Sequence, residues 1–186
     1  MPRLFVALEI PPAVRQELAR LRRGMPGARW VPEEQFHLTL AFLGEVEGPA
    51  SSAVQEGLHG VRGDPFLMEL AAAGRFPHRG QAKVLWAGIR QDTEVLALIK
   101  EVQRCLKRRG LLGESRRPSP HVTLARLRGV PPQALDDCLE ALASWVSEPF
   151  PVTEFHLYSS HLGREGAQHR IEASYPLIPT RLREGR

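Results

Sequence analysis

The sequence predicts an α+β fold made of two similar β-α-β-α-β units, whose two antiparallel-type sheets face each other with the helices outside. Two observations lead to this prediction. Residues 35–46 (QFHLTLAFLGEV) are echoed 84 positions later by residues 119–130 (SPHVTLARLRGV). Strand-like and helix-like segments also follow in the same order in both halves, with the echoed segment third in each. An internal duplication explains both observations.

The first unit contains three predicted strands and two predicted helices. Residues 3–10 alternate as a strand does and stop at a pair of prolines, after which Val14, Leu18 and Leu21 recur at helical spacing. In order, we expect strand, helix, strand, helix and strand over residues 3–10, 12–24, 36–44, 50–61 and 65–75.

The second unit repeats this order. Its clearest element is a helix, because Val95, Leu98, Val102 and Leu106 form one apolar face. In order, we expect strand, helix, strand, helix and strand over residues 83–89, 93–109, 120–128, 133–145 and 150–160, then a last strand over 168–177.

The domain organisation follows from the same pattern. No low-complexity linker separates the units, so we expect one bilobal domain over residues 1–178, with lobes formed around the 36–44 and 120–128 strands. Residues 179–186 are expected to form a loose basic tail. Hydrophobic residues make up 42% of the chain and charged residues 25%, which is ordinary for a soluble globular protein.

The composition also bears on compartment and partners. No apolar run reaches membrane-spanning length, and Glu9 interrupts the short apolar stretch at the start, so neither a membrane span nor a secretory signal is expected. Cys105 and Cys138 lack CxxC spacing, so they predict neither a zinc site nor a disulfide framework. We therefore expect a cytoplasmic monomer without membrane contact. The net charge of +4, with arginine far commoner than lysine, weakly favours an anionic partner.

The echoed segments carry the candidate functional residues. In an extended strand, successive side chains alternate between faces, so His37 and Thr39 share one face while the leucines beside them point into a core. His121 and Thr123 are placed in the same way. Two such strands facing one groove supply an acid, a base and two neutral hydrogen-bond donors. That set is suited to opening a phosphodiester.

Two other interpretations of the motifs compete with this one. Both histidines can be half-buried strand residues, with the threonines present for β-propensity, although two matching five-residue frames make chance a poor explanation. A metal site would need further ligands, and neither motif has a second His, Cys or carboxylate two to four residues away.

With His37-Leu-Thr39-Leu and His121-Val-Thr123-Leu, the chain resembles the 2H phosphoesterase superfamily, and within it the RNA 2′,3′-cyclic phosphodiesterases formerly described as 2′-5′ RNA ligases. Arg3-Leu-Phe-Val-Ala-Leu at the start also matches that subfamily. The resemblance covers residues 2–178. It implies a bilobal fold with a central cleft, no metal or other cofactor, and hydrolysis of an RNA 2′,3′-cyclic phosphate end to a 2′-phosphate.

The resemblance also implies roles for individual residues. His37 and His121 would be the catalytic acid and base, and Thr39 and Thr123 would bind the phosphate oxygens. The sequence leaves open which histidine is the acid, and His37 is favoured. Arg126 would lie beside the phosphate or on the base, yet a regular strand puts it on the opposite face from His121, so a bulge or bend is needed. From the residues, Phe5 is expected in the core, and on the resemblance alone Phe5 or Trp30 would form the other side of a base sandwich.

Other functions remain open from the sequence. If a 5′-hydroxyl replaced water as the nucleophile, the same site would join two RNA ends through a 2′-5′ linkage. The same fold could open a cyclic phosphate on a nucleotide or an ADP-ribose derivative. A third possibility is an RNA-binding module whose His/Thr groove holds a phosphate without turning it over.

Overall fold

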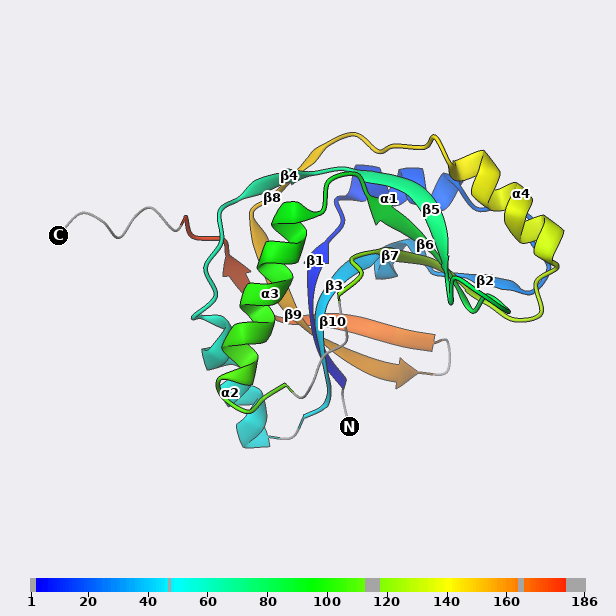
Figure 1. Cartoon of the computed structure of the whole chain (residues 1–186). Coiled ribbons are helices and arrows are strands. Elements are labelled where there is room, and N and C mark those ends of the chain that lie inside the picture. The colour runs from blue at the N-terminus through cyan, green and yellow to red at the C-terminus, as the bar shows by residue number, and fades with distance from the viewer. Residues whose placement is uncertain (1–2, 47, 113–117, 164–165, 180–186) are drawn as a thin grey trace.

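The computed structural model describes residues 3–46, 48–112, 118–163 and 166–179, and it confirms the predicted α+β class (Figure 1). In chain order the elements are β1 (Arg3–Glu9), α1 (Pro12–Arg20), β2 (Ala28–Trp30), the 3₁₀ helix η1 (Glu33–Gln35), β3 (His37–Glu45), α2 (Gly48–Leu58), β4 (Phe66–Met68), β5 (Leu70–Phe76), β6 (Val84–Ile89), α3 (Thr93–Lys107), β7 (Val122–Leu127), α4 (Pro132–Leu142), β8 (Phe150–Val152), β9 (Glu154–Gly163) and β10 (Gly166–Pro176). Of the predicted tail over residues 179–186, residues 180–186 lie outside the described residues. Among the described residues, no helix is both long enough and apolar enough to cross a membrane.

In the described part of the chain, eight antiparallel strands form one sheet that divides into two halves. The order is β10-β9-β1-β3-β7-β6-β5, with β2 also paired to β7. The strands β10, β9, β1 and β3 are called here the His37 half, and β7, β6, β5 and β2 the His121 half. The halves are joined where Leu38 pairs with Val122, the single pair between β3 and β7. Beyond that pair β3 and β7 separate, which leaves a face of each half free.

The two halves exchange strands between the repeated units. β5 ends the first unit but pairs with β6 of the second, and β9 ends the second unit but pairs with β1 of the first. Each half is therefore built from both units, and neither half is continuous in the sequence. The strand expected over 65–75 is also divided, because β4 leaves the main sheet and pairs with β8.

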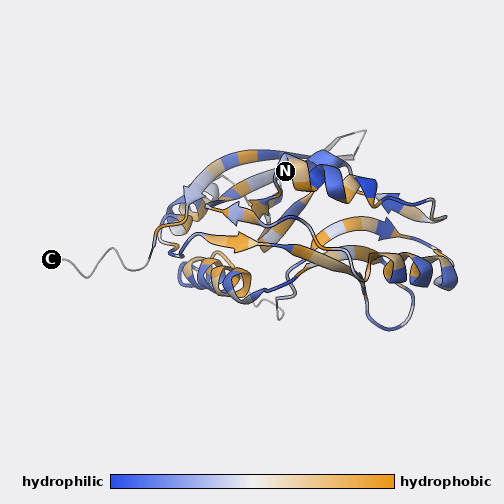
Figure 2. Cartoon of the chain, turned by 90° about the horizontal axis from the view of Figure 1, so that it is seen from above, coloured by the Kyte–Doolittle hydropathy of each residue, from blue (hydrophilic) through white to orange (hydrophobic). Residues whose placement is uncertain are grey.

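The helices cover the sheet on the side that carries the core. α3 packs against β3, α2 packs against α3, and α4 packs against β5. Figure 2 shows hydrophobic and hydrophilic residues alternating along the strands and around the helices, as half-buried elements require. Leu38 and Leu40 of β3, like Val122 and Leu124 of β7, are at most 2% exposed and belong to this core. The opposite side chains of β3 and β7 are thus directed away from the helices.

A β-bulge interrupts β3 and β7 at the same place in each repeat. In β3, Ala41 pairs with Val6 and Thr39 with Ala7, so Leu40 has no partner in β1. In β7 the corresponding extra residue is Leu124, which the register against β6 skips. Because a bulge adds one residue, the alternation of side chains is reset beyond it.

Candidate active site

His37, Thr39, His121 and Thr123 line one cavity of about 1160 Å³ between the two halves of the sheet. His37 begins β3, and His121 directly precedes β7. The residues between each His/Thr pair, Leu38 and Val122, are fully buried, so the alternation of a strand places all four polar side chains on the free face. The structure therefore brings together the four residues of the two echoed motifs.

Both imidazole rings are oriented by the same backbone contact. Nδ1 of His37 lies 2.7 Å from the carbonyl oxygen of Gln35, and Nδ1 of His121 lies 2.7 Å from that of Ser119. A carbonyl oxygen only accepts hydrogen bonds, so Nδ1 carries the proton in each ring. Nε2 is then the nitrogen that gains or loses a proton, as acid–base chemistry in the cavity requires.

His37 lies in an aromatic cluster that disfavours its charged form. Its ring centroid is 4.9 Å from that of Phe5 and 5.1 Å from that of His169, which meets it edge-on at 78°. Burial lowers the pKa of His37 to about 4, although its bond to Gln35 opposes this, and the positive charges of His169, His121 and Arg126 lower it further. His37 is therefore neutral near pH 7.

The surroundings of His121 are similar but less enclosing. Phe76 meets its ring edge-on at 79°, with centroids 5.0 Å apart, as His169 does for His37. Trp86 lies 6.3 Å away, and Gly74 makes room for it, since a Cβ at Gly74 would stand 2.1 Å from the indole ring. Burial first, and the charge of Arg126 second, lower the pKa of His121 below its usual value.

The threonine hydroxyls are available to a ligand. Both side chains are partly exposed in the cavity wall, and within the described residues neither hydroxyl has a protein hydrogen-bond partner. Both threonines are β-branched, which restricts rotation about χ1 and holds each hydroxyl in place. Two such donors on opposite walls are suited to oxygens that lie between them.

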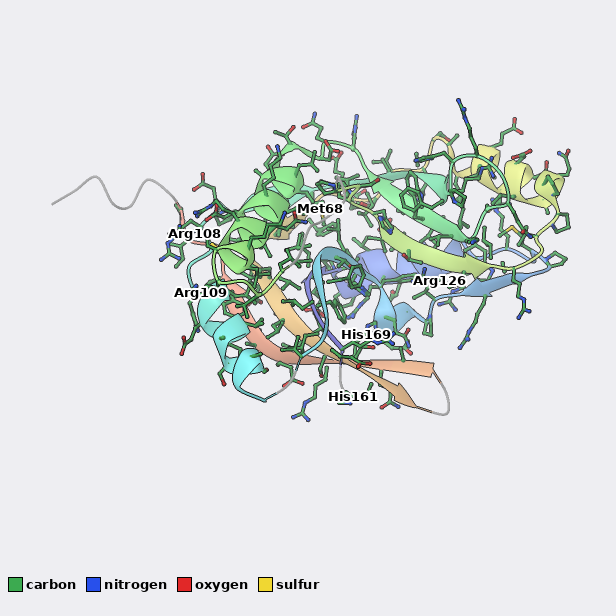
Figure 3. The ribbon with its side chains drawn as sticks, turned by 60° about the horizontal axis from the view of Figure 1, so that its bottom comes forward. Met68, Arg108, Arg109, Arg126, His161 and His169 are labelled. Atoms are coloured by element: carbon green, nitrogen blue, oxygen red, sulfur yellow. The ribbon has the colours of Figure 1, made fainter. Side chains whose placement is uncertain are left out.

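Arg126 reaches the cavity because of the bulge at Leu124. Regular alternation would have directed it away from His121, but the extra residue turns it to the same face, where it lines the cavity. Figure 3 shows Arg126 on β7 and His169 on β10, in the two different halves of the sheet. Arg29 pairs with Arg126 across β2 and β7 and lines the same wall. This end of the cavity is thus strongly positive.

Phe5 does not fit the base-stacking role expected from the resemblance. It lines the cavity, but the residue is only 4% exposed, and its ring stacks on that of Tyr158, with centroids 5.1 Å apart and planes 10° apart. With one face covered and little surface left, it packs beside His37 instead of offering a face to a ligand. Trp30 also lines the cavity and donates its indole N–H to the carbonyl oxygen of Arg23 at 3.1 Å.

Sequence reasoning missed several residues of the cavity wall. His169 and Phe76 lie in strands with no motif, so no sequence signal marks their contacts with the catalytic candidates. Phe42 had a signal that could have been used, since it stands five residues after His37 as Arg126 does after His121. Among the described residues, no group of three or more His, Cys, Asp or Glu side chains is placed to hold a metal ion.

The chain is similar to several known proteins. The family profile of the 2′-5′ RNA ligase superfamily matches residues 10–164. A protein of Aeropyrum pernix named RNA 2′,3′-cyclic phosphodiesterase is 39% identical over 118 residues, which are 60% of this chain and 66% of that protein. One of the same name from Thermotoga maritima is 31% identical over 91% of this chain and 92% of its own length. The crystal structure of E. coli LigT complexed with 3′-AMP is similar at 27% identity with a TM-score of 0.75, covering 96% of this chain and 99% of that one.

Proposed function

The chain belongs to the 2′-5′ RNA ligase superfamily, and from that premise we propose that it hydrolyses the 2′,3′-cyclic phosphate at the end of an RNA to a 2′-phosphate. The observation that carries the proposal is the pair of imidazoles in one cavity, each with Nδ1 fixed by a carbonyl and Nε2 left for proton transfer. The relatives described above carry the name of this activity.

The reaction needs one proton removed and one supplied. Water attacks phosphorus as the bond from phosphorus to O3′ breaks, so the water proton goes to a base and O3′ takes a proton from an acid. We assign the base to His37, whose lower pKa keeps it neutral, and the acid to His121. This reverses the expectation from the sequence that His37 is the acid.

The substrate itself sets the two protonation states. A bound anionic phosphate favours the charged form of His121, and the resulting charge disfavours a second proton on His37. The two rings then hold one proton between them, which is the state that acid–base catalysis requires. Thr39 and Thr123 donate to the non-bridging oxygens, and Arg126 offsets the charge that grows on them.

The same protonation states allow ligation. If a 5′-hydroxyl takes the place of water, its proton goes to His37, the bond from phosphorus to O3′ breaks as before, and the product is a 2′-5′ phosphodiester. Water is far more concentrated than any 5′-hydroxyl end, so hydrolysis dominates.

The test is a single-turnover assay with EDTA-treated protein and an RNA that ends in a 2′,3′-cyclic phosphate. We expect a 2′-phosphate product, and a loss of about 10²- to 10⁴-fold for His37→Ala and for His121→Ala. His59→Ala is the matched control, because His59 is exposed and lies outside the cavity. A 3′-phosphate product would contradict the assigned leaving group. Turnover confined to cyclic mononucleotides or ADP-ribose derivatives would contradict the RNA substrate. Binding of the RNA without turnover would mean that the protein is an RNA-binding module.

A further inference from the structure

Phe42 is an exposed aromatic side chain in the wall of the cavity. Its exposure is 70%, against 4% for Phe5, which lies beside it on β1. Exposure of a large aromatic side chain to water is unfavourable, so a location inside a ligand cavity points to a partner that covers the ring. Leu67 is also 70% exposed, but it does not line the cavity and makes a useful control.

The duplication places Phe42 and Arg126 at equivalent positions. Each stands five residues after the histidine of its repeat, and each is turned to the cavity by the bulge two residues before it. β3 and β7 are antiparallel and pair at Leu38 and Val122, so residues beyond the threonines extend in opposite directions. The cavity therefore has two ends, one at Phe42 and one at Arg126, with the His/Thr centre between them.

The Phe42 end combines an aromatic face with an exposed ion pair between Arg3 and Glu45, which both line the cavity. The ring of Phe42 rests near that of Phe5, with centroids 6.2 Å apart. Arg3 lines the same end, and its guanidinium is 3.7 Å from the Glu45 carboxylate in a pair whose side chains are 65% and 53% exposed. An ion pair this exposed is weak, so Arg3 can exchange it for a phosphate. Stacking surfaces next to cations are how proteins hold single-stranded nucleic acid.

We propose that the Phe42 end binds the nucleotide that precedes the cyclic-phosphate-bearing nucleotide of an RNA, with its base on Phe42 and the linking phosphodiester facing Arg3. The inference rests on the proposed function, since it takes the His/Thr centre as the place of the cyclic phosphate, and it adds that the terminal base lies toward the Arg126 end, past the phosphate. It assigns a substrate of at least two nucleotides to this site. A cyclic mononucleotide leaves the Phe42 end empty.

The experiment compares kcat/KM for a dinucleotide ending in a 2′,3′-cyclic phosphate with kcat/KM for the 2′,3′-cyclic mononucleotide. We expect the wild-type protein to prefer the dinucleotide by about 10-fold or more, the order of one base–aromatic stack. Phe42→Ala should lower this ratio about 10-fold, mainly through KM for the dinucleotide, and Phe42→Trp should keep it. Leu67→Ala should leave both constants as in the wild type, because Leu67 lies outside the cavity.

The outcomes separate this inference from the proposed function. If the wild-type protein turns over neither substrate, the proposed function fails, and this inference fails with it. If it turns over both and Phe42→Ala leaves their ratio as in the wild type, the inference alone is overturned. Equal losses of kcat/KM for both substrates in Phe42→Ala would mean that Phe42 contacts the terminal base, and this result would also overturn the inference.

Discussion

At the scale of single residues, the site depends on how two chemically identical side chains are made different. Both histidines use Nδ1 in the same contact, so the difference comes from what surrounds the rings. His37 has Phe5 and His169 against it and the larger drop in pKa, whereas His121 is less enclosed. Neighbouring groups whose environments separate their pKa values are typical of acid–base pairs.

The threonines provide the first prediction at this scale. Thr39→Val and Thr123→Val keep the β-branched shape but remove the donor, so each should lower kcat by roughly 10- to 10³-fold. The measurement is steady-state hydrolysis of a cyclic-phosphate RNA. Thr39→Ser and Thr123→Ser restore the hydroxyl and should recover most of the rate. Full activity in both valine variants would show that the hydroxyls do not bind the phosphate.

At the scale of elements, two bulges shape the cavity. Without the extra residue at Leu124, the side chain of Arg126 would point away from His121. Without the extra residue at Leu40, the side chain of Phe42 would no longer line the cavity. The buried leucines that form the bulges are part of the core, so the register that directs the polar side chains is held by packing on the other face.

Arg126 offers a prediction that tests this register. Arg126→Ala should raise KM for a cyclic-phosphate dinucleotide by about 10-fold, because a charge-assisted contact to the substrate is lost. Arg128→Ala is the matched control, since Arg128 is also exposed, follows the same strand and does not line the cavity. Equal effects of the two substitutions would mean that Arg126 acts only through general positive charge.

The repeat made some elements predictable and left others hidden. The strands of the echoed motifs followed from alternation, and α3 from its apolar face. β2 has only three residues, which are too few for a periodic signal. The strand face on which Arg126 lies could not be predicted from the sequence, because a bulge depends on pairing with another strand. His169 contacts His37 from β10, and no local pattern encodes a contact so distant in the chain.

At the scale of the whole molecule, the exchange of strands joins the two repeats into one structure. β5 of the first unit pairs with β6 of the second, and β9 of the second unit pairs with β1 of the first. The cavity lies where these halves separate beyond Leu38 and Val122, and both of these residues belong to the shared core. Duplication thus supplies two similar walls, and exchange holds them facing each other.

The partly buried histidines of the cavity make global stability depend on pH. The pKa of His37 is lowered to about 4, and those of His121 and His169 are also lowered, mainly by burial. Below pH ~6.5 the unfolded chain binds protons that the folded protein does not, so the free energy of unfolding should decrease as pH falls toward 4. For His37 alone the loss is about 1–3 kcal/mol.

Urea denaturation at several pH values measures this effect. The midpoint should fall from pH 7 to pH 4.5 in the wild-type protein and fall less in His37→Asn, which cannot bind the proton. A midpoint that is constant over this range, or that falls equally in both proteins, would mean that His37 is not held neutral by the fold.

The central claim is that His37 acts as the neutral base and His121 as the charged acid on one phosphate, and the pH dependence of kcat/KM tests it most directly. With a 2′,3′-cyclic mononucleotide and EDTA present, we predict a bell-shaped profile with its maximum below pH 6.5, because His37 must be unprotonated and His121 protonated in the free enzyme. The alkaline limb should disappear in His121→Ala and persist in His37→Ala at a reduced rate. Loss of the alkaline limb in His37→Ala instead would contradict the account.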